Sequence, residues 1–147
     1  MSTPAIHIRR MRTADLPFVS TIQAASPEAA QWPPADYLAH PSLVAVAGRA
    51  VVGFAVARPL PPDELEILNI AVDPKLRRHG IGRALLQAML EVPARTVYLE
   101  VRASNLAARN FYTQLGFAEA GQRKNYYGLA ASPGVFEDAI VMKMQKW

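Results

Sequence analysis

The sequence of 147 residues contains no cysteine and no apolar run long enough to cross a membrane. Without cysteine there can be no disulfide, no thiolate metal site and no cysteine acyl-enzyme. A membrane helix needs roughly 18 consecutive apolar residues, and the opening MSTPAIHIRRMR becomes charged too early for a signal peptide. We therefore expect a soluble protein of a reducing, cytoplasmic compartment that makes no membrane contact.

Two other kinds of site also lack sequence support. The histidines His7, His40 and His79 have neither metal-ligand spacing nor acidic neighbours, so we expect no metal site. No serine lies in a Gly-x-Ser-x-Gly turn, which removes support for a hydrolase triad.

The composition predicts a single folded domain over residues 1–147, because 51% of the residues are hydrophobic and 19% are charged. The formal net charge of +4 favours an anionic partner. Basic residues gather around Lys75, Arg77, Arg78 and Arg83, and no basic stripe alternates with aromatic residues. This distribution favours a phosphorylated cofactor over nucleic acid.

Hydrophobic periodicity, capping residues and turn residues predict an α+β domain built around one sheet. The predicted strands are 6–8, 42–47, 50–57, 64–72, 96–101, 117–121 and 137–144. The predicted helices are one that Thr13 caps and that ends near Ala25, a short one carrying Tyr37 and Leu38, one over 81–90, and one capped by Ser104 or Asn105 that ends at Leu115. Residues 123–136 are predicted to form a loop.

The stretch RRHGIGRALLQAML, residues 77–90, joins a strand to a helix through Gly-x-Gly. In such a turn, free backbone N–H groups and the helix dipole can meet an anion. It is not a Walker loop, because Arg83 and Ala84 follow Gly82, and Leu85 replaces the third glycine of a dinucleotide fingerprint. The spacing alone fits an ordinary helix-starting turn equally well, and the neighbouring arginines favour a phosphate site.

Two side chains further along the chain each have a structural and a catalytic interpretation. Glu100 alternates with the apolar positions of its predicted strand, so it is either a solvent-facing residue or a general base. Tyr112 lies on a helical stripe with Phe111 and Leu115, so it either packs in the core or donates a proton through its hydroxyl.

These motifs, taken in order, resemble the GNAT family of acetyl-CoA-dependent N-acetyltransferases. Arg77, Gly80 and Gly82 match the signature Gln/Arg-x-x-Gly-x-Gly/Ala after the fourth strand, and Asn105, Tyr112 and Leu115-Gly116-Phe117 match the following segments. The segments NIAVDP, LEVRASN, NYY and EDAIVM resemble one branch, which acetylates the N-terminal alanine of a small-subunit ribosomal protein. The likeness extends from about Glu64 to Met144.

The resemblance implies a mixed, largely antiparallel sheet of six to seven strands flanked by about four helices. It also implies acetyl-CoA as cosubstrate, with Glu100 as the base and Tyr112 as the acid that protonates the departing thiolate. The implied cofactor-binding residues are Ile70, Ala71, Val72, Arg77, Arg78, His79, Gly80, Ile81, Gly82, Arg83 and Asn105. Without cysteine, direct attack in a ternary complex is favoured over a ping-pong mechanism.

The implied acceptor is the N-terminal segment of a ribosomal or other protein, and Tyr126 and Tyr127 either wall its slot or are plain surface aromatics. An α-amine, with a pKa of about 7.9, offers on the order of 300 times more neutral amine at pH 7 than lysine, with a pKa of about 10.4. A lysine side chain or a small-molecule amine stays open as the alternative acceptor. A non-catalytic acyl-CoA-binding module would need neither Glu100 nor Tyr112.

Overall fold

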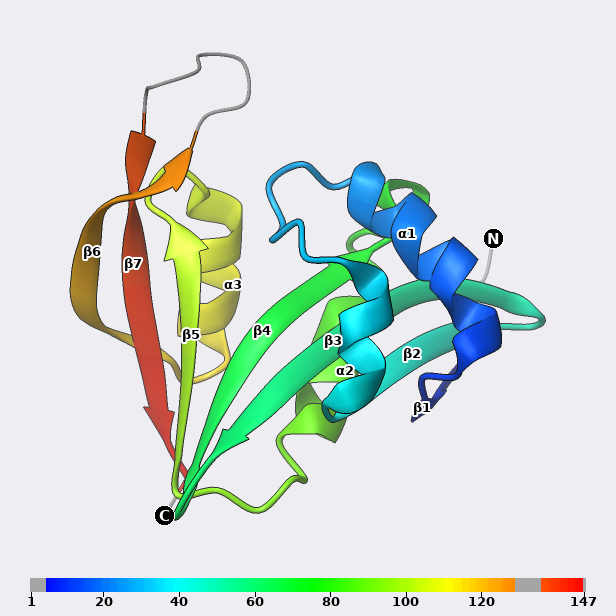
Figure 1. Ribbon diagram of the computed structural model, residues 1–147, viewed down its shortest axis with the longest axis horizontal. Helices are drawn as coiled ribbons and strands as arrows, with labels where there is room; N and C mark the ends of the chain where they lie inside the picture. The colour runs from blue at the N-terminus through cyan, green and yellow to red at the C-terminus, as the bar shows by residue number, and fades with distance from the viewer. Residues whose placement is uncertain (1–4, 129–135, 147) are drawn as a thin grey trace. The chain divides into compact units, whose positions relative to one another are not determined.

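The computed structural model describes the backbone of residues 5–128 and 136–146, and the side chains of residues 5–124 and 137–146 (Figure 1). The strands are β1 (Ile6–Arg10), β2 (Ser42–Ala47), β3 (Ala50–Leu60), β4 (Glu64–Val72), β5 (Thr96–Arg102), β6 (Ala118–Gly128) and β7 (Phe136–Gln145). The helices are α1 (Leu16–Ala24), α2 (Ile81–Met89) and α3 (Leu106–Gln114), with short 3-10 helices η1 (Thr13–Asp15), η2 (Pro34–Ala39) and η3 (Pro74–Leu76). In the described part of the chain, no helix is long and apolar enough to span a membrane.

The seven strands follow the order β1-β2-β3-β4-β5-β7-β6, which confirms the predicted α+β fold. The pairs β1–β2, β2–β3, β5–β7 and β6–β7 are antiparallel. The chain divides into two compact units, residues 1–58 with 67–93 and residues 59–66 with 94–147. That the whole chain acts as one domain stays a prediction.

In the first unit, apolar side chains from β2, β3 and α1 form the core. Its buried members include Val19, Ile22, Val44, Phe54 and Val56. Helices α1 and α2 cover opposite faces of strands β2 and β3 (Figure 1). As predicted, α2 buries one apolar face, formed by Ile81, Leu85, Leu86 and Met89.

Glycine at position 53 lets α2 lie close against β3. A Cβ atom on Gly53 would be 3.1 Å from the Cδ1 atom of Leu85 and 3.1 Å from the carbonyl oxygen of Ala71. Any larger side chain would push α2 outward, because packed interiors have little room to give. This contact fixes α2, and with it the turn that precedes the helix.

In the second unit, α3 lies beside β5 (Figure 1). Along β5, Val97, Leu99 and Val101 are buried, whereas Glu100 is partly exposed. Of the two predicted caps of α3, Asn105 is the N-cap, and its side-chain oxygen accepts a hydrogen bond from the backbone N–H of Ala108 at 3.2 Å. Gly116 ends the helix with a φ of 104°.

Two sequence predictions are wrong for the described elements. Residues 123–128 are not loop, because β6 continues to Gly128 and pairs with the start of β7. Thr13 does not cap the first helix, since Thr13–Asp15 is a 3-10 turn and α1 begins at Leu16. Asp15, the residue directly before α1, is buried with 4% exposure and pairs with Arg9.

We expect Asp15→Asn to lose more stability at neutral pH than in acid. Arg9 donates hydrogen bonds of 2.8 and 2.9 Å to the Asp15 carboxylate and lowers its pKa. A carboxyl whose pKa falls on folding stabilises the protein above its unfolded pKa of about 3.9, and this contribution disappears as the pH falls through the folded pKa.

Urea unfolding at pH 7 should therefore show a loss of about 1.5–3 kcal/mol, the usual value of hydrogen bonds to charged groups. At pH 3, below the unfolded pKa of about 3.9, the loss should be smaller, because the charge-dependent stabilisation declines as the pH falls toward the lowered pKa of folded Asp15. Asp36→Asn, at an exposed position, serves as the control. An equal loss at both pH values would show that Asp15 stabilises the fold by shape rather than by charge.

Candidate active site

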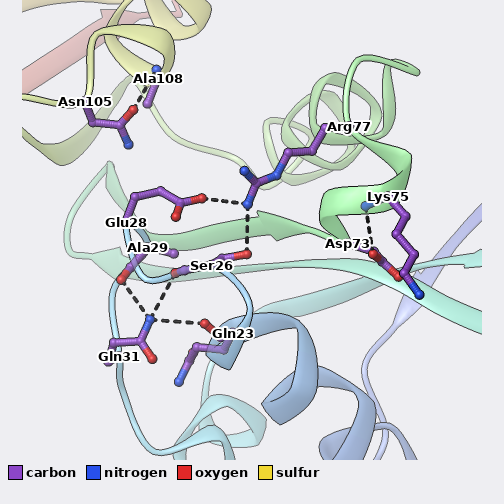
Figure 2. Close-up of polar contacts among 10 residues, drawn as sticks. All are labelled: Gln23, Ser26, Glu28, Ala29, Gln31, Asp73, Lys75, Arg77, Asn105 and Ala108. Atoms are coloured by element: carbon purple, nitrogen blue, oxygen red, sulfur yellow. Dashed lines mark hydrogen bonds and ion pairs between the residues drawn. The ribbon is translucent and has the colours of Figure 1, made fainter.

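The turn between β4 and α2 presents a helix N-terminus beside several cations. Asp73 begins the turn, and its side chain accepts a hydrogen bond from the backbone N–H of Lys75 at 3.0 Å (Figure 2). The backbone then enters the left-handed region twice, at Arg78 with a φ of 67° and at Gly80 with a φ of 79°. Such curled backbone exposes N–H groups to an anion.

Helix α2 starts directly after this turn. Gly80 is its N-cap, and the first hydrogen bond of the helix runs from the N–H of Ala84 to the carbonyl of Gly80. The N–H groups of Ile81, Gly82 and Arg83 precede that bond, so they are the free donors of a helix start. The side chains of Lys75, Arg77, Arg78, His79 and Arg83 are exposed around them. The turn therefore combines free amides, a helix dipole and positive charge.

The strand that leads into this turn carries the other cofactor residues predicted for the first unit. Ala71 is buried, while Ile70 and Val72 are partly exposed. The N–H of Asp73 donates to the carbonyl of Val52 at 2.8 Å, which ties the end of β4 to β3. The strand end and the turn are thus fixed within one compact unit.

Glu100, the predicted base, lies in the second unit and is held by an arginine. Nη1 of Arg123 donates to Oε1 of Glu100 at 2.6 Å, and the two side chains are 54% and 17% exposed. Sequence reasoning missed this pair, since a separation of 23 residues leaves no local signal. The carboxylate is therefore neither deeply buried nor freely solvated.

Tyr112 is packed between two aromatic rings in the second unit. Its ring centroid is 5.1 Å from that of Phe111 and 5.7 Å from that of Phe117, in edge-to-face arrangements. The ring is partly exposed rather than buried, so the predicted packing stripe of α3 covers it only in part. Aromatic contacts of this kind fix the position of a ring.

Asn105 contributes one half of its amide to the helix cap. Its Oδ1 atom accepts a hydrogen bond from the N–H of Ala108, as Figure 2 shows. Because the oxygen is used by the cap, Nδ2 is the atom with which Asn105 could donate to a ligand. Tyr126 and Tyr127, predicted to wall the acceptor slot, are not among the residues whose side chains the structure describes. Among the described residues, no group of three or more His, Cys, Asp or Glu side chains is placed to hold a metal ion.

A buried polar cluster of the first unit also escaped the sequence analysis. Gln23, Tyr37 and Asn69 are 6%, 2% and 6% exposed. Nδ2 of Asn69 donates to the Tyr37 hydroxyl at 3.2 Å and to Oε1 of Gln23 at 3.3 Å. The asparagine inside the apolar strand ELEILNIAV could have indicated this cluster, since a buried amide requires hydrogen-bond partners.

Comparison with known proteins agrees with this geometry. The model of the acetyltransferase (GNAT) family matches residues 8–117. A [ribosomal protein bS18]-alanine N-acetyltransferase of Salmonella typhimurium is 49% identical over 86 residues, which are 56% of this chain and 56% of that protein. The N-alpha-acetyltransferase RimI of Mycobacterium tuberculosis is 40% identical over 122 residues, 76% of this chain and 74% of that protein.

A solved structure gives the same result for the fold. The ribosomal-protein-S18-alanine N-acetyltransferase of Escherichia coli superposes with a TM-score of 0.80 and 33% identity, covering 96% of this chain and 94% of that one. With the turn, the strand order and the family match in agreement, the chain belongs to the acetyltransferase (GNAT) family.

Proposed function

We propose that the protein transfers an acetyl group from acetyl-CoA to the N-terminal α-amine, in particular that of alanine, of a small-subunit ribosomal protein. The observation that carries this proposal is the cationic, left-handed turn at the start of α2, followed along the chain by Glu100 and Tyr112. The names of the relatives from Salmonella and Escherichia coli support the choice of acceptor. Such an acceptor would place the reaction in the cytoplasm.

The pyrophosphate of CoA would rest on the backbone amides of residues 78–83. A helix start stabilises an anion through its N–H groups and its dipole, and the glycines leave room for close approach. The arginine side chains of the turn add charge of the right sign, and His79 offers a hydrogen-bond donor. The pantetheine would follow the backbone at Ile70 and Val72, and Asn105 would contact it through its free Nδ2 donor.

The proposed chemistry is direct attack of the amine on the thioester carbonyl. The nitrogen–carbon bond forms, the carbon–sulfur bond breaks, and the β4 backbone near Val72 would stabilise the oxyanion that develops. Glu100 would take the proton that the amine loses, directly or through water. Tyr112 would give its proton to the departing thiolate, and its aromatic neighbours would keep the hydroxyl in place.

Arg123 bears on the role of Glu100, because it already holds one carboxylate oxygen at 2.6 Å. A substrate ammonium carries the same charge as the guanidinium and would take its place, or would use the second oxygen. Where the ammonium displaces the guanidinium, the carboxylate oxygen that Arg123 releases is open to the amine proton. The pair therefore supports Glu100 as a cation-binding group and not merely a solvent-facing one.

The proposal is tested with two peptides of otherwise equal sequence. One carries a free N-terminal alanine, and the other has a blocked terminus and a free lysine. We expect the first to be acetylated at least about 100-fold faster near pH 7, because the difference in neutral amine on its own is on the order of 300-fold. Faster acetylation of the lysine peptide would favour the alternative acceptor.

We expect Gly82→Glu to weaken acetyl-CoA binding by at least about tenfold, because a carboxylate within a few ångströms of the pyrophosphate costs more than about 1.4 kcal/mol. The fold should survive, since an acidic residue in the first turn of a helix is stabilising. Calorimetric titration with CoA measures the change. Gln87→Glu, on the exposed side of α2, alters the net charge equally and should bind CoA normally. Equal affinity in both variants would remove the turn from the CoA site.

A further inference from the structure

Residues 26–32, between α1 and η2, form an irregular segment whose backbone is held by side chains. Nε2 of Gln31 donates to the carbonyls of Gln23, Ser26 and Ala29 at 3.2, 3.1 and 3.1 Å (Figure 2). Irregular backbone held by so many side-chain bonds has one preferred conformation, because each bond replaces a contact with water. The segment 26–32 therefore has a defined conformation within the first unit.

Buried side-chain hydrogen bonds join this segment to Asn69 of β4 and to Gln23 of α1. Nδ2 of Asn69 donates to the carbonyl of Ala30 at 2.9 Å, and Nε2 of Gln23 donates to the carbonyl of Trp32 at 2.7 Å. Buried polar groups are costly unless they are fully hydrogen-bonded, so they specify one arrangement strongly. Asn69 directly precedes Ile70, which places the segment next to the strand proposed to carry the thioester.

A second set of hydrogen bonds joins the segment to the turn before α2. Nη2 of Arg77 donates to Oγ of Ser26 at 3.1 Å and to Oε1 of Glu28 at 2.6 Å (Figure 2). Ser26 is 1% exposed, whereas the Arg77 and Glu28 side chains are 44% and 40% exposed. A guanidinium has five donors on three nitrogens, and these two bonds use only one nitrogen.

We propose that Arg77 is a positioning residue that couples acetyl-CoA binding to the acceptor site. Its Nη2 atom holds residues 26–32, and its other two nitrogens would donate to an anion bound at the same turn. The incoming amine must reach the thioester beside β4, so residues 26–32, hydrogen-bonded to Asn69 on that strand, form one wall of its path. This inference rests on the proposed function.

The direction of the coupling follows from the ordering of one side chain that both sites share. A bound pyrophosphate would fix the Arg77 guanidinium, which in turn would favour the bonded conformation of Ser26 and Glu28. Acetyl-CoA would then strengthen acceptor binding, and the acceptor would strengthen acetyl-CoA binding by the same factor. Glu28 reports on this coupling specifically, because it contacts Arg77 but lies outside the turn itself.

Steady-state kinetics with varied peptide and acetyl-CoA test the inference. We expect Glu28→Gln and Arg77→Gln each to raise the KM for the peptide by up to about fivefold, the scale of an exposed ion pair. The double variant should do no more than either single one, because both remove the same contact. By reciprocity the KM for acetyl-CoA should rise in these variants too, whereas Arg83→Gln should raise the KM for acetyl-CoA and leave that for the peptide unchanged. An unchanged peptide KM in Glu28→Gln would overturn the inference.

Hydrogen exchange of residues 26–32 supplies a readout that needs no acetyl transfer. Desulfo-CoA should slow exchange in this segment of the wild-type protein and leave it unaltered in Glu28→Gln, although both proteins bind desulfo-CoA equally well. If no peptide is acetylated but this difference appears, the proposed function fails and the coupling stands. If desulfo-CoA binds and protects the segment equally in both proteins, or in neither, the coupling is wrong.

Discussion

Glu100→Gln should lower turnover by about 10²–10⁴-fold, the usual contribution of a general base. The amide keeps the size of the side chain and can still accept a hydrogen bond from Arg123, so the fold should be preserved. The loss should be most severe below neutral pH, where an α-amine of pKa about 7.9 is mostly protonated. Above that pH, neutral amine is available without a base.

The affinity of Glu100→Gln for CoA should be nearly that of the wild type, because the proposed pyrophosphate contacts belong to residues 78–83. Pre-steady-state acetyl transfer over a range of pH, together with a CoA titration, separates the two effects. Glu119→Gln is the control, since Glu119 is also a glutamate paired with an arginine, Arg109, although its side chain is more exposed, 53% against 17% for Glu100. Unchanged turnover in Glu100→Gln would remove Glu100 from the chemistry.

Tyr112→Phe should slow acetyl transfer by about 100-fold, at the lower end of general acid catalysis. This loss of rate should be smaller than the loss in Glu100→Gln, because a thiol with a pKa near 8.5 can leave as a thiolate without being protonated. The ring contacts with Phe111 and Phe117 do not involve the hydroxyl, so packing should be retained. The KM values for both substrates should change little.

The matched control for Tyr112 is Tyr98→Phe on β5. The hydroxyl of Tyr98 donates to Oε2 of Glu64 at 3.0 Å, so this substitution removes a bonded hydroxyl from the same unit. Thermal unfolding of both variants shows whether either loss is structural. Equal turnover in Tyr112→Phe and Tyr98→Phe would contradict the assignment of Tyr112 as the acid.

The regular elements of this fold were predictable because their periodicity is local. The apolar spacing of Ile81, Leu85 and Met89 defines the buried face of α2, and Asn105 followed by Gly116 marks the limits of α3. The alternation along TVYLEV places Glu100 opposite the buried face of β5. In each case the deciding residues lie within one element.

The errors arose where distant residues decide the local structure. Residues 123–128 contain asparagine and glycine and lack alternation, but pairing with β7 makes them strand. Thr13 fits a helix cap by its residue type, whereas Thr13–Asp15 forms a 3-10 turn in which Asp15 is bonded to Arg9. The contact of Arg77 with Glu28 spans 49 residues, so no local pattern could reveal it.

The central claim is that the protein acetylates an α-amine using acetyl-CoA, and one peptide can test it. The peptide begins with a free alanine and also contains an internal lysine, so the two amines compete in the same reaction. After incubation with the protein and acetyl-CoA, fragmentation by mass spectrometry locates the added acetyl group. The account predicts acetylation at the terminal nitrogen, abolished or strongly slowed in Glu100→Gln. Acetylation confined to the lysine, or equal in the presence and absence of the protein, would contradict it.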